Sequence, residues 1–408
     1  MKKQILSSTL IFLVIYSYSQ QWTFLGFPGE KISAIAVHPT NPNMIFVSGD
    51  NLYKSSDGGI NWDTVASHSF NSIIFHPDNP DTMYATLGIG SNSDGIYKSI
   101  DGGNNWDILE WMDLSTSLMI PGYPSGTIVA GTKGMGIYES SDYGNTWAQI
   151  NDSLDNLNVL SLSYIDPWDC DSGQTYFAGT EGGIFYYPYD FGGPWNNTNT
   201  ATNATVPAIS SDRTYYLWAA IDGGSWSDGM YKSTYGGTWN VSEYWPFITD
   251  ILINPLNLNN VYAPNTVYAA DSGYGVKKTI NGGMSWETIN DGLGDSVVYC
   301  LAQSRADTTL LYAGTLNGVY VLDFSSWIPE TLNENNIAVY PNPTDDKIEI
   351  ESPQDANIEI INIQGQIIET LNTINTNTTI DVAKLSGGFY IIKVKTDKGT
   401  TVKKFIKE

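Results

Sequence analysis

Several residue types are scarce in this 408-residue sequence, and their scarcity excludes classes of function. Lysine and arginine together number 19 against 43 aspartates and glutamates, so the formal net charge is −24. Binding to nucleic-acid phosphates or to an anionic membrane surface needs a basic footprint, which this composition lacks. We therefore expect no nucleic-acid partner. Cysteine occurs only at Cys170 and Cys300, and a chain of this length can bury a core without disulfide bonds.

Glycine, tyrosine and tryptophan are abundant instead, with 39, 26 and 13 residues, while charged residues make up only 15% of the sequence. Aromatic residues favour strands, and glycines favour tight turns. The composition therefore predicts an all-β protein with many turns.

The first residues have the pattern of a secretory signal peptide. Two lysines precede a short apolar run at 10–16, and the small residues Ser17 and Ser19 stand at −3 and −1 of a cleavage site before Gln20. The run is too short to cross about 30 Å of hydrocarbon as a helix. We therefore interpret 1–19 as a signal peptide and not as a membrane anchor.

The middle of the sequence repeats one unit seven times. The unit contains a glycine–apolar–aromatic step or a close variant of it. Intervals of 41 to 47 residues separate these steps, which end at residues 53, 97, 138, 185, 231, 277 and 320. A period of this length with four short strands per unit is typical of propeller blades. The repeat predicts a seven-bladed β-propeller over 20–328.

Six of the steps lead into a turn motif of the form S-x-D-x-G-x-x-W, clearest in YKSSDGGINW at 53–62 and YKSIDGGNNW at 97–106. In such a turn the aspartate accepts hydrogen bonds from backbone N–H groups, the glycines adopt positive φ, and the tryptophan packs on the hairpin. The unit resembles the Asp-box, or bacterial neuraminidase repeat, and the resemblance implies residues that hold the fold and do not catalyse. The residues assigned this structural role are Asp57, Trp62, Asp101, Trp106, Asp142, Trp147, Asp190, Trp195, Trp239, Asn281 and Trp286.

The two ends of the repeat region bear on how the ring closes. After Tyr320 the chain has a strand but no further turn motif, whereas QWTFLG at 21–26 is similar to the NWDTVA segment at 61–66. We therefore predict that 21–26 pairs beside 309–323, with Trp22 as a seventh motif tryptophan, because this pairing leaves no open sheet edge.

The predicted ring also bears on the cysteines and histidines. Cys170 falls in blade four and Cys300 in blade seven, on opposite sides, and a disulfide needs Cα atoms within about 7 Å. We predict two free thiols. His38 and His76 occupy the same place in a repeated His-Pro turn, which favours a structural role. We expect no bound metal and no cofactor.

The sequence changes character after a linker at 329–335. Short alternating strands and turns over 336–408 predict a small Ig-like β-sandwich. VYPNPTDDKIEI at 339–350 and LSGGFYIIKV at 385–394, followed by a basic terminus, resemble the type A sorting domain of the type IX secretion system. The resemblance implies export across the outer membrane, with the secretion machinery as a partner. It also implies either release or attachment to surface lipopolysaccharide.

A ligand is expected on the propeller face that carries the second-to-third-strand loops and the connections between blades, because loops on a rigid scaffold carry binding. Three tryptophans outside the turn motifs fall in loops or at strand ends and can stack on sugar rings, and three aspartates recur before the glycine–aromatic step. These candidate ligand-binding residues are Trp111, Trp226, Trp245, Asp94, Asp228 and Asp271. We expect a monomer that binds a glycan or a protein.

Two enzyme families with similar repeats offer catalytic alternatives. Sialidases grip the substrate carboxylate with three arginines, and this sequence has only Arg213 and Arg305, so that chemistry is excluded. IAVHPTNPNMIFVSGD at 35–50 resembles the opening blade of xyloglucanase-type endoglucanases, which implies Asp50 as the catalytic aspartate. Inverting hydrolysis needs a second carboxylate about 6.5–9.5 Å away, and that family takes it from a second propeller, which this sequence lacks. We therefore favour an exported, non-catalytic binding or adhesion protein, with a glycoside hydrolase that uses Asp50 as the alternative.

Overall fold

The computed structural model describes most of the chain, in two compact units, Met1–Ser325 and Ser326–Glu408. Among the described residues, no helix is both long and apolar enough to cross a membrane. The described residues are 21–87, 94–110, 114–121, 124, 126–166, 174–200, 203–212, 216–223, 228–234, 236–254, 266–325, 338–341, 343–351, 356–362, 367–373, 377–396 and 399–407.

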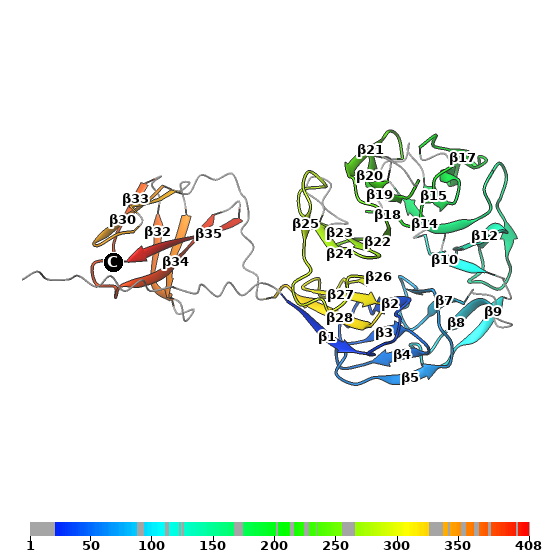
Figure 1. Ribbon diagram of the computed structural model, residues 1–408, viewed down its shortest axis with the longest axis horizontal. Helices are drawn as coiled ribbons and strands as arrows, with labels where there is room; N and C mark the ends of the chain where they lie inside the picture. The colour runs from blue at the N-terminus through cyan, green and yellow to red at the C-terminus, as the bar shows by residue number, and fades with distance from the viewer. Residues whose placement is uncertain are drawn as a thin grey trace, which may run out of the picture. The chain divides into compact units, whose positions relative to one another are not determined.

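The first unit is a seven-bladed β-propeller in which every blade is a four-stranded antiparallel sheet (Figure 1). Blade one consists of β2 (Ala34–Val37), β3 (Ile45–Ser48), β4 (Leu52–Ser55) and β5 (Asp63–Ala66). Blade two consists of β6 (Ser72–Phe75), β7 (Met83–Leu87), β8 (Gly95–Ser99) and β9 (Asp107–Glu110). Blade three consists of β10 (Ser115–Met119), β11 (Ile128–Thr132), β12 (Gly136–Ser140) and β13 (Ala148–Gln149). Blade four consists of β14 (Val159–Ile165), β15 (Thr175–Thr180), β16 (Gly183–Pro188) and β17 (Asn196–Asn197), with the short 3-10 helix η1 (Tyr189–Phe191) before β17. Blade five consists of β18 (Ile209–Ser211), β19 (Tyr216–Ile221), β20 (Gly229–Thr234) and β21 (Trp239–Glu243). Blade six consists of β22 (Ile248–Ile253), β23 (Val267–Asp271), β24 (Gly275–Thr279) and β25 (Glu287–Thr288).

Blade seven is closed by the N-terminal strand, as predicted from the sequence. It consists of β26 (Val298–Ala302), β27 (Leu310–Thr315), β28 (Gly318–Asp323) and, from the other end of the chain, β1 (Trp22–Gly26). β1 pairs antiparallel with β28, with Trp22 opposite Leu322 and Phe24 opposite Tyr320. The pairing joins the first and last strands of the ring, so the ring has no free edge where it closes.

The core lies between adjacent blades. Every residue of the second strands β3, β7, β11 and β23 is buried. These strands are apolar on both sides because a neighbouring blade covers each face of their sheet. Phe46 of blade one, for example, packs with Met83 and Ala85 of blade two.

The strand order sorts the connections onto two faces of the propeller. Because the strands alternate in direction, the second-to-third-strand loops and the connections between blades share one face, which we call the loop face. The first-to-second-strand turns and the motif turns between third and fourth strands share the other, which we call the turn face.

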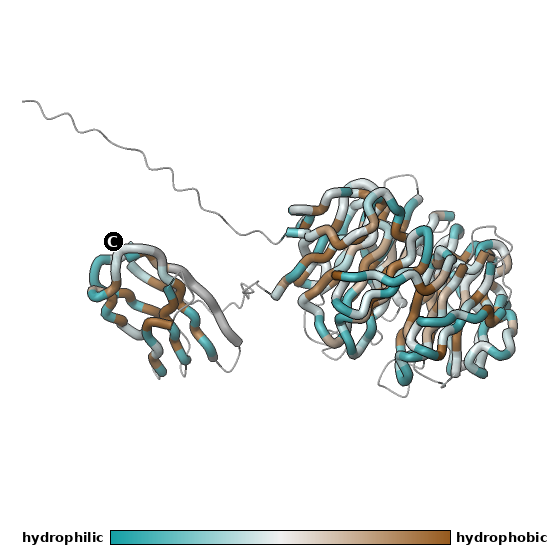
Figure 2. Tube along the Cα trace, turned by 90° about the horizontal axis from the view of Figure 1, so that it is seen from below, coloured by the Kyte–Doolittle hydropathy of each residue, from teal (hydrophilic) through white to brown (hydrophobic). Residues whose placement is uncertain are grey.

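The second unit is a small β-sandwich of two antiparallel sheets. Hydrophobic and hydrophilic positions alternate along the strands of this unit (Figure 2). In β31 the alternate residues Ala356, Ile358 and Ile360 are buried in the core. Ile348, Ile360, Ile392 and Phe405 are fully buried in that core. One sheet contains β29 (Ala338–Tyr340), β30 (Lys347–Glu351) and β33 (Asn377–Asp381), and the other contains β32 (Ile367–Thr373), β31 (Ala356–Asn362), β34 (Gly388–Thr396) and β35 (Gly399–Lys407). The predicted fold class, a seven-bladed propeller followed by a β-sandwich, is confirmed.

Candidate binding site on the loop face

On the turn face, the aspartates of the repeated turn motif accept hydrogen bonds from their own turns. Asp57 Oδ1 accepts hydrogen bonds from the backbone N–H groups of Ile60 (3.1 Å) and Asn61 (2.9 Å). The hydrogen bonds from Asn61 lower the pKa of Asp57 to about 2. Asp101 and Asp142 bind their own turns in the same way, and hydrogen bonds from the turn asparagine lower the pKa of Asp101 to about 2. Carboxylates that accept this many internal hydrogen bonds are poorly placed to act on a ligand.

Two copies of the turn motif differ from the others. Asn281 keeps the turn, since its Oδ1 accepts the backbone N–H of Ser285 at 3.0 Å and the Thr279 hydroxyl at 2.9 Å. Asp190 lies instead in the 3-10 helix η1, and its carboxylate accepts the backbone N–H of Gln174 at 2.6 Å. Asp190 therefore ties its turn to the start of β15 and does not close a turn of its own.

The motif tryptophans pack on their own hairpins or on a neighbouring blade. Trp106 and Trp147 donate their indole N–H groups to glycine carbonyls of their own turns at 3.1 and 3.0 Å. Trp286 donates to a serine hydroxyl of the preceding blade at 3.1 Å. The indole N–H groups of Trp62 and Trp239 are buried without a hydrogen-bond partner. Trp239 is buried and the other four tryptophans are partly buried.

Trp22 and Trp195 form a separate pair with the same surroundings in two different blades. Each is nearly fully buried, at 4% and 2% exposure. Each donates its indole N–H over 2.5 Å to an isoleucine carbonyl of the preceding blade, Ile289 and Ile150 respectively. The N-terminal Trp22 therefore occupies the position in blade seven that Trp195 occupies in blade four.

Three tryptophans outside the turn motif were predicted to stack on a ligand, and the structure describes one of them, Trp245. Trp245 is only 4% exposed and packs with Met230 and Ile248, and the Lys277 amine lies 4.5 Å from its ring centroid. The expectation that Trp245 stacks on a ligand is wrong, because its ring is covered from within the chain. Trp111 and Trp226 lie outside the described residues.

The three candidate aspartates lie on the loop face but are anchored to it. Asp94 is 4% exposed. Asp228 Oδ1 accepts the backbone N–H of Gly223 at 2.7 Å. Asp271 is fully buried, and its Oδ1 accepts the backbone N–H of Tyr274 at 2.8 Å while its Oδ2 has no hydrogen-bond partner. Burial raises the pKa of Asp271 to about 6. Asp271 is therefore the candidate with unused hydrogen-bonding capacity.

Large exposed apolar side chains also lie on the loop face. They were not predicted from the sequence, because only tryptophans were considered as residues that stack on a ligand. Tyr244, Phe247 and Tyr274 are 70%, 55% and 61% exposed. The backbone N–H of Ser272 donates to the Phe247 carbonyl at 3.1 Å, which holds the connection between blades five and six beside the loop that carries Tyr274. We call Tyr244, Phe247 and Tyr274 the loop-face aromatic patch. Further exposed residues on this face are Leu114, Leu157 and Leu316.

Acidic residues outnumber basic ones on the described part of the loop face. Its connections carry two lysines, Lys31 and Lys133, and Lys31 lies over the Tyr299 ring at 4.2 Å. The acidic residues of these connections are Glu30, Asp50, Asp94, Asp152, Asp155, Glu181, Asp222, Asp228, Asp291 and Asp295. The face therefore carries a negative potential that attracts cationic groups.

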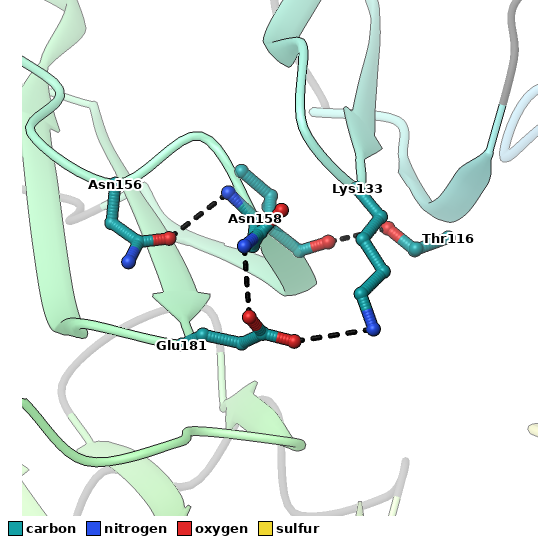
Figure 3. Close-up of polar contacts among 6 residues, drawn as sticks. Thr116, Lys133, Asn156, Asn158 and Glu181 are labelled. Carbon is teal, nitrogen blue, oxygen red and sulfur yellow. Dashed lines mark hydrogen bonds and ion pairs between the residues drawn. The ribbon is translucent and has the colours of Figure 1, made fainter.

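Lys133 belongs to a polar network between blades three and four (Figure 3). Its amine lies 3.2 Å from Glu181 Oε1, while Asn158 donates to Glu181 Oε2 at 2.8 Å and Asn156 accepts the backbone N–H of Asn158 at 2.9 Å. Thr116 adds a 2.7 Å hydrogen bond to a backbone carbonyl of the next blade. The network joins two blades, so its charges are largely used within the chain.

The hydrolase alternative depends on Asp50, which is exposed on the loop between β3 and β4. Its backbone N–H donates to the carboxylate of Glu30, which also accepts the Tyr53 hydroxyl at 3.4 Å. Glu30 was not singled out from the sequence. It lies beside Asp50 on the same rim and is held by two donors there, so the contact does not supply the opposed acid that inverting hydrolysis requires.

The central channel contains two cavities that meet at a ring of apolar side chains. One, of about 450 Å³, is mainly apolar and includes the turn-face ends of the first strands. The other, of about 270 Å³, lies toward the loop face and is lined by hydroxyl groups and by Asp250. Ile35, Ile73 and Leu301 are among the residues that line both.

Two titratable groups lie in the channel wall: Asp250, which was not singled out from the sequence, and Cys300. Asp250 accepts the backbone N–H groups of Leu301 and Ile251, both at 2.8 Å, and burial raises its pKa to about 6. Cys300 is a buried free thiol, as predicted, and burial raises its pKa. Cys170 lies outside the described residues.

The two repeated histidines lie in turns. His38 Nδ1 accepts the backbone N–H groups of Thr40 and Asn41 at 3.2 and 3.1 Å, and His76 Nδ1 accepts that of Asp78 at 3.2 Å. Within the described ranges, no three His, Cys, Asp or Glu side chains gather in a way that could hold a metal ion.

Comparison with known protein families identifies the C-terminal unit. The family described as the secretion system C-terminal sorting domain matches residues 338–408. This unit is therefore a sorting domain of the type IX secretion system, and the protein is exported across the outer membrane to the cell surface or the extracellular space. A comparison with curated proteins finds no significant match.

Solved structures similar to this chain are propellers of low sequence identity. A structure of YCF48 bound to D1 peptide is 16% identical, with 77% of this chain and 98% of that chain covered and a TM-score of 0.53. YCF48 from Cyanidioschyzon merolae is 15% identical, with 74% and 98% covered and a TM-score of 0.51. The extracellular domain of BT4673 from B. thetaiotaomicron is 12% identical, with 82% and 45% covered and a TM-score of 0.58. At these identities the likeness shows the fold, so the chain is an exported β-propeller protein with a sorting domain.

Proposed function

We propose that this protein is a non-catalytic binding or adhesion protein of the cell surface or extracellular space, whose ligand is a glycan or a protein. The observation that carries the proposal is the loop-face aromatic patch. Tyr244, Phe247 and Tyr274 are each more than half exposed, and exposed apolar groups gathered beside polar ones are typical of interaction sites. The YCF48 structure with a bound peptide supports it as an example of a similar propeller that binds a protein segment.

Further parts of the proposal concern processing and assembly. We propose a signal peptide at 1–19, a propeller over 20–328, a linker at 329–335 and a sorting domain over 336–408. Removal of the sorting domain releases the propeller as a monomer or attaches it to surface lipopolysaccharide. Mass spectrometry of the exported protein, with cell fractionation, distinguishes release from attachment.

The test uses the secreted chain, purified without its signal peptide. The purified protein is applied to a glycan array and is used to capture proteins from the extracellular fraction of the producing cells. Binding to a defined glycan or protein with a Kd in the micromolar range or below supports the proposal. Turnover of a β-glucan that is lost in Asp50→Ala contradicts it and establishes the hydrolase alternative. The absence of both binding and turnover also contradicts it.

A further inference from the structure

The loop-face aromatic patch is held in place by backbone hydrogen bonds that span two blades. Phe247 is fixed by Ser272, which belongs to the same turn as Tyr274. The adjacent Gly273 donates its N–H to Ser296 at 3.1 Å, in the connection to blade seven. The backbones of Phe247 and of the Tyr274 turn are therefore joined to each other and to the next connection, and Tyr244 lies three residues before Phe247 on the same short connection.

Phe247 is strained as well as exposed. Its φ of +63° lies in the left-handed region, which bulky side chains rarely adopt. Leu114, at the matching place before the first strand of blade three, has a φ of +56° and accepts the backbone N–H of Lys133 just as Phe247 accepts that of Ser272. A glycine would fit this conformation without strain. A strained phenylalanine with 55% of its surface exposed gains little within this unit, which points to a role for its side chain in contact with another molecule.

The charges around the patch define the ligand chemistry. Lys277, three residues after Tyr274, is paired with Glu243 at 3.1 Å. Asp271, three residues before Tyr274, is fully buried and adds its charge from beneath the surface, while Asp228 and Asp295 lie on the neighbouring connections. Aromatic faces attract cations, and the surrounding carboxylates strengthen that attraction.

We infer that the loop-face aromatic patch docks a basic segment of a protein partner. The inference rests on the proposed binding function and adds the chemical class of the ligand. Lysine or arginine side chains of the segment lie over the exposed rings and toward the carboxylates, while apolar side chains of the segment cover Phe247. A neutral glycan would also stack on the rings and donate its hydroxyl groups to individual carboxylates, but it carries no positive charge for the negative potential to attract, so the charge distribution favours the basic segment.

The experiment compares two probes on the full secreted chain. The probes are fluorescent 12-residue peptides that share the same leucine and glycine positions, with lysine in one and glutamate in the other. We expect the lysine peptide to bind with a micromolar Kd that weakens as salt rises, and the glutamate peptide not to bind. In the variant Tyr244→Ser/Phe247→Ser/Tyr274→Ser we expect the affinity for the lysine peptide to fall at least tenfold.

The control separates docking on the patch from general attraction to an acidic protein. The variant Ile60→Ser/Ile100→Ser/Met284→Ser removes side chains that are 80%, 74% and 88% exposed on the turn face and leaves the net charge unchanged. It should bind the lysine peptide within twofold of wild type. Equal binding by all three proteins overturns the inference, since it assigns the attraction to net charge alone. If the patch variant loses a glycan-array signal while the peptide affinity stays unchanged, the inference is overturned in favour of a glycan and the proposed function stands.

Discussion

Replacing Trp22 by alanine tests whether the N-terminal strand closes the ring through its indole. The side chain is 4% exposed, packs with Tyr320 and Leu322, and donates to the Ile289 carbonyl at 2.5 Å. A buried tryptophan covers about 150–250 Å², and Trp→Ala substitutions in cores cost about 3–5 kcal/mol. We expect a loss of this size, because the cavity would open at a junction that joins the two ends of the propeller chain.

The assay is urea unfolding of the secreted chain, combined with amide hydrogen exchange. Exchange should accelerate first in β28, the strand that β1 covers, because local opening of blade seven becomes easier. Trp195→Ala is the matched control, since Trp195 makes the same hydrogen bond to the preceding blade but belongs to a blade built from continuous chain. A loss in Trp22→Ala below about 1 kcal/mol, a scale at which surface changes operate, would refute the closure argument. Loss of exchange protection spread evenly over all blades would refute the local mechanism.

Three further predictions concern backbone strain and pH. Phe247→Gly should raise the free energy of unfolding by about 0.5–1 kcal/mol, because relief of the left-handed strain exceeds the entropy cost of glycine. The same variant should bind the lysine peptide more weakly. A melting temperature below that of wild type would contradict the expected gain in stability. The pKa of Asp101 is lowered to about 2 in the folded state, so its contribution to stability is complete above its unfolded value of 3.8 and is lost as the pH falls toward 2. In Asp101→Asn, unfolding curves between pH 4 and 2 should therefore show a smaller dependence on pH than wild type. The pKa of Asp250 is raised to about 6, so the folded state holds more protons than the unfolded state between about pH 4 and 6 and stability falls as the pH rises through that window. Asp250→Asn should remove this part of the slope, and an unchanged slope would show that Asp250 does not titrate there.

The repeat determined how much of the fold could be predicted. Seven steps at intervals of 41 to 47 residues predict the number of blades. A missing fourth strand at one end, matched by an extra strand at the other, predicts the closure by Trp22. The hydrogen bonds of Asp57 are local, within four residues of it, so sequence spacing alone could predict a turn there. Asp190 shows the limit, because its partner Gln174 lies 16 residues away, just before β15.

The candidate site was harder to predict because exposure is not a local property. Trp245 follows an outer strand, and the sequence predicts it in a loop or at a strand end. The chain there turns back toward Gly229 and buries the ring against Met230. Tyr244, one residue earlier, is 70% exposed. An irregularity in the pairing of β22 with β23 falls between Ile248 and Asp250, at the place where Asp250 lines the channel. Neither the reversal of the chain nor the shift in register has a signature in residue type.

The distribution of exposed apolar residues separates the two faces of the propeller. On the turn face, Ile60, Ile100 and Met284 are highly exposed, but each lies on the turn of a different sheet. The aspartate or asparagine of each turn accepts hydrogen bonds from its own backbone. Single exposed apolar residues of this kind are normal on a protein surface and need no partner. On the loop face, exposed rings occur on two connections that are joined by a backbone hydrogen bond, next to a strained backbone. Strain and exposure each cost stability, and contact with another molecule at this site would offset both.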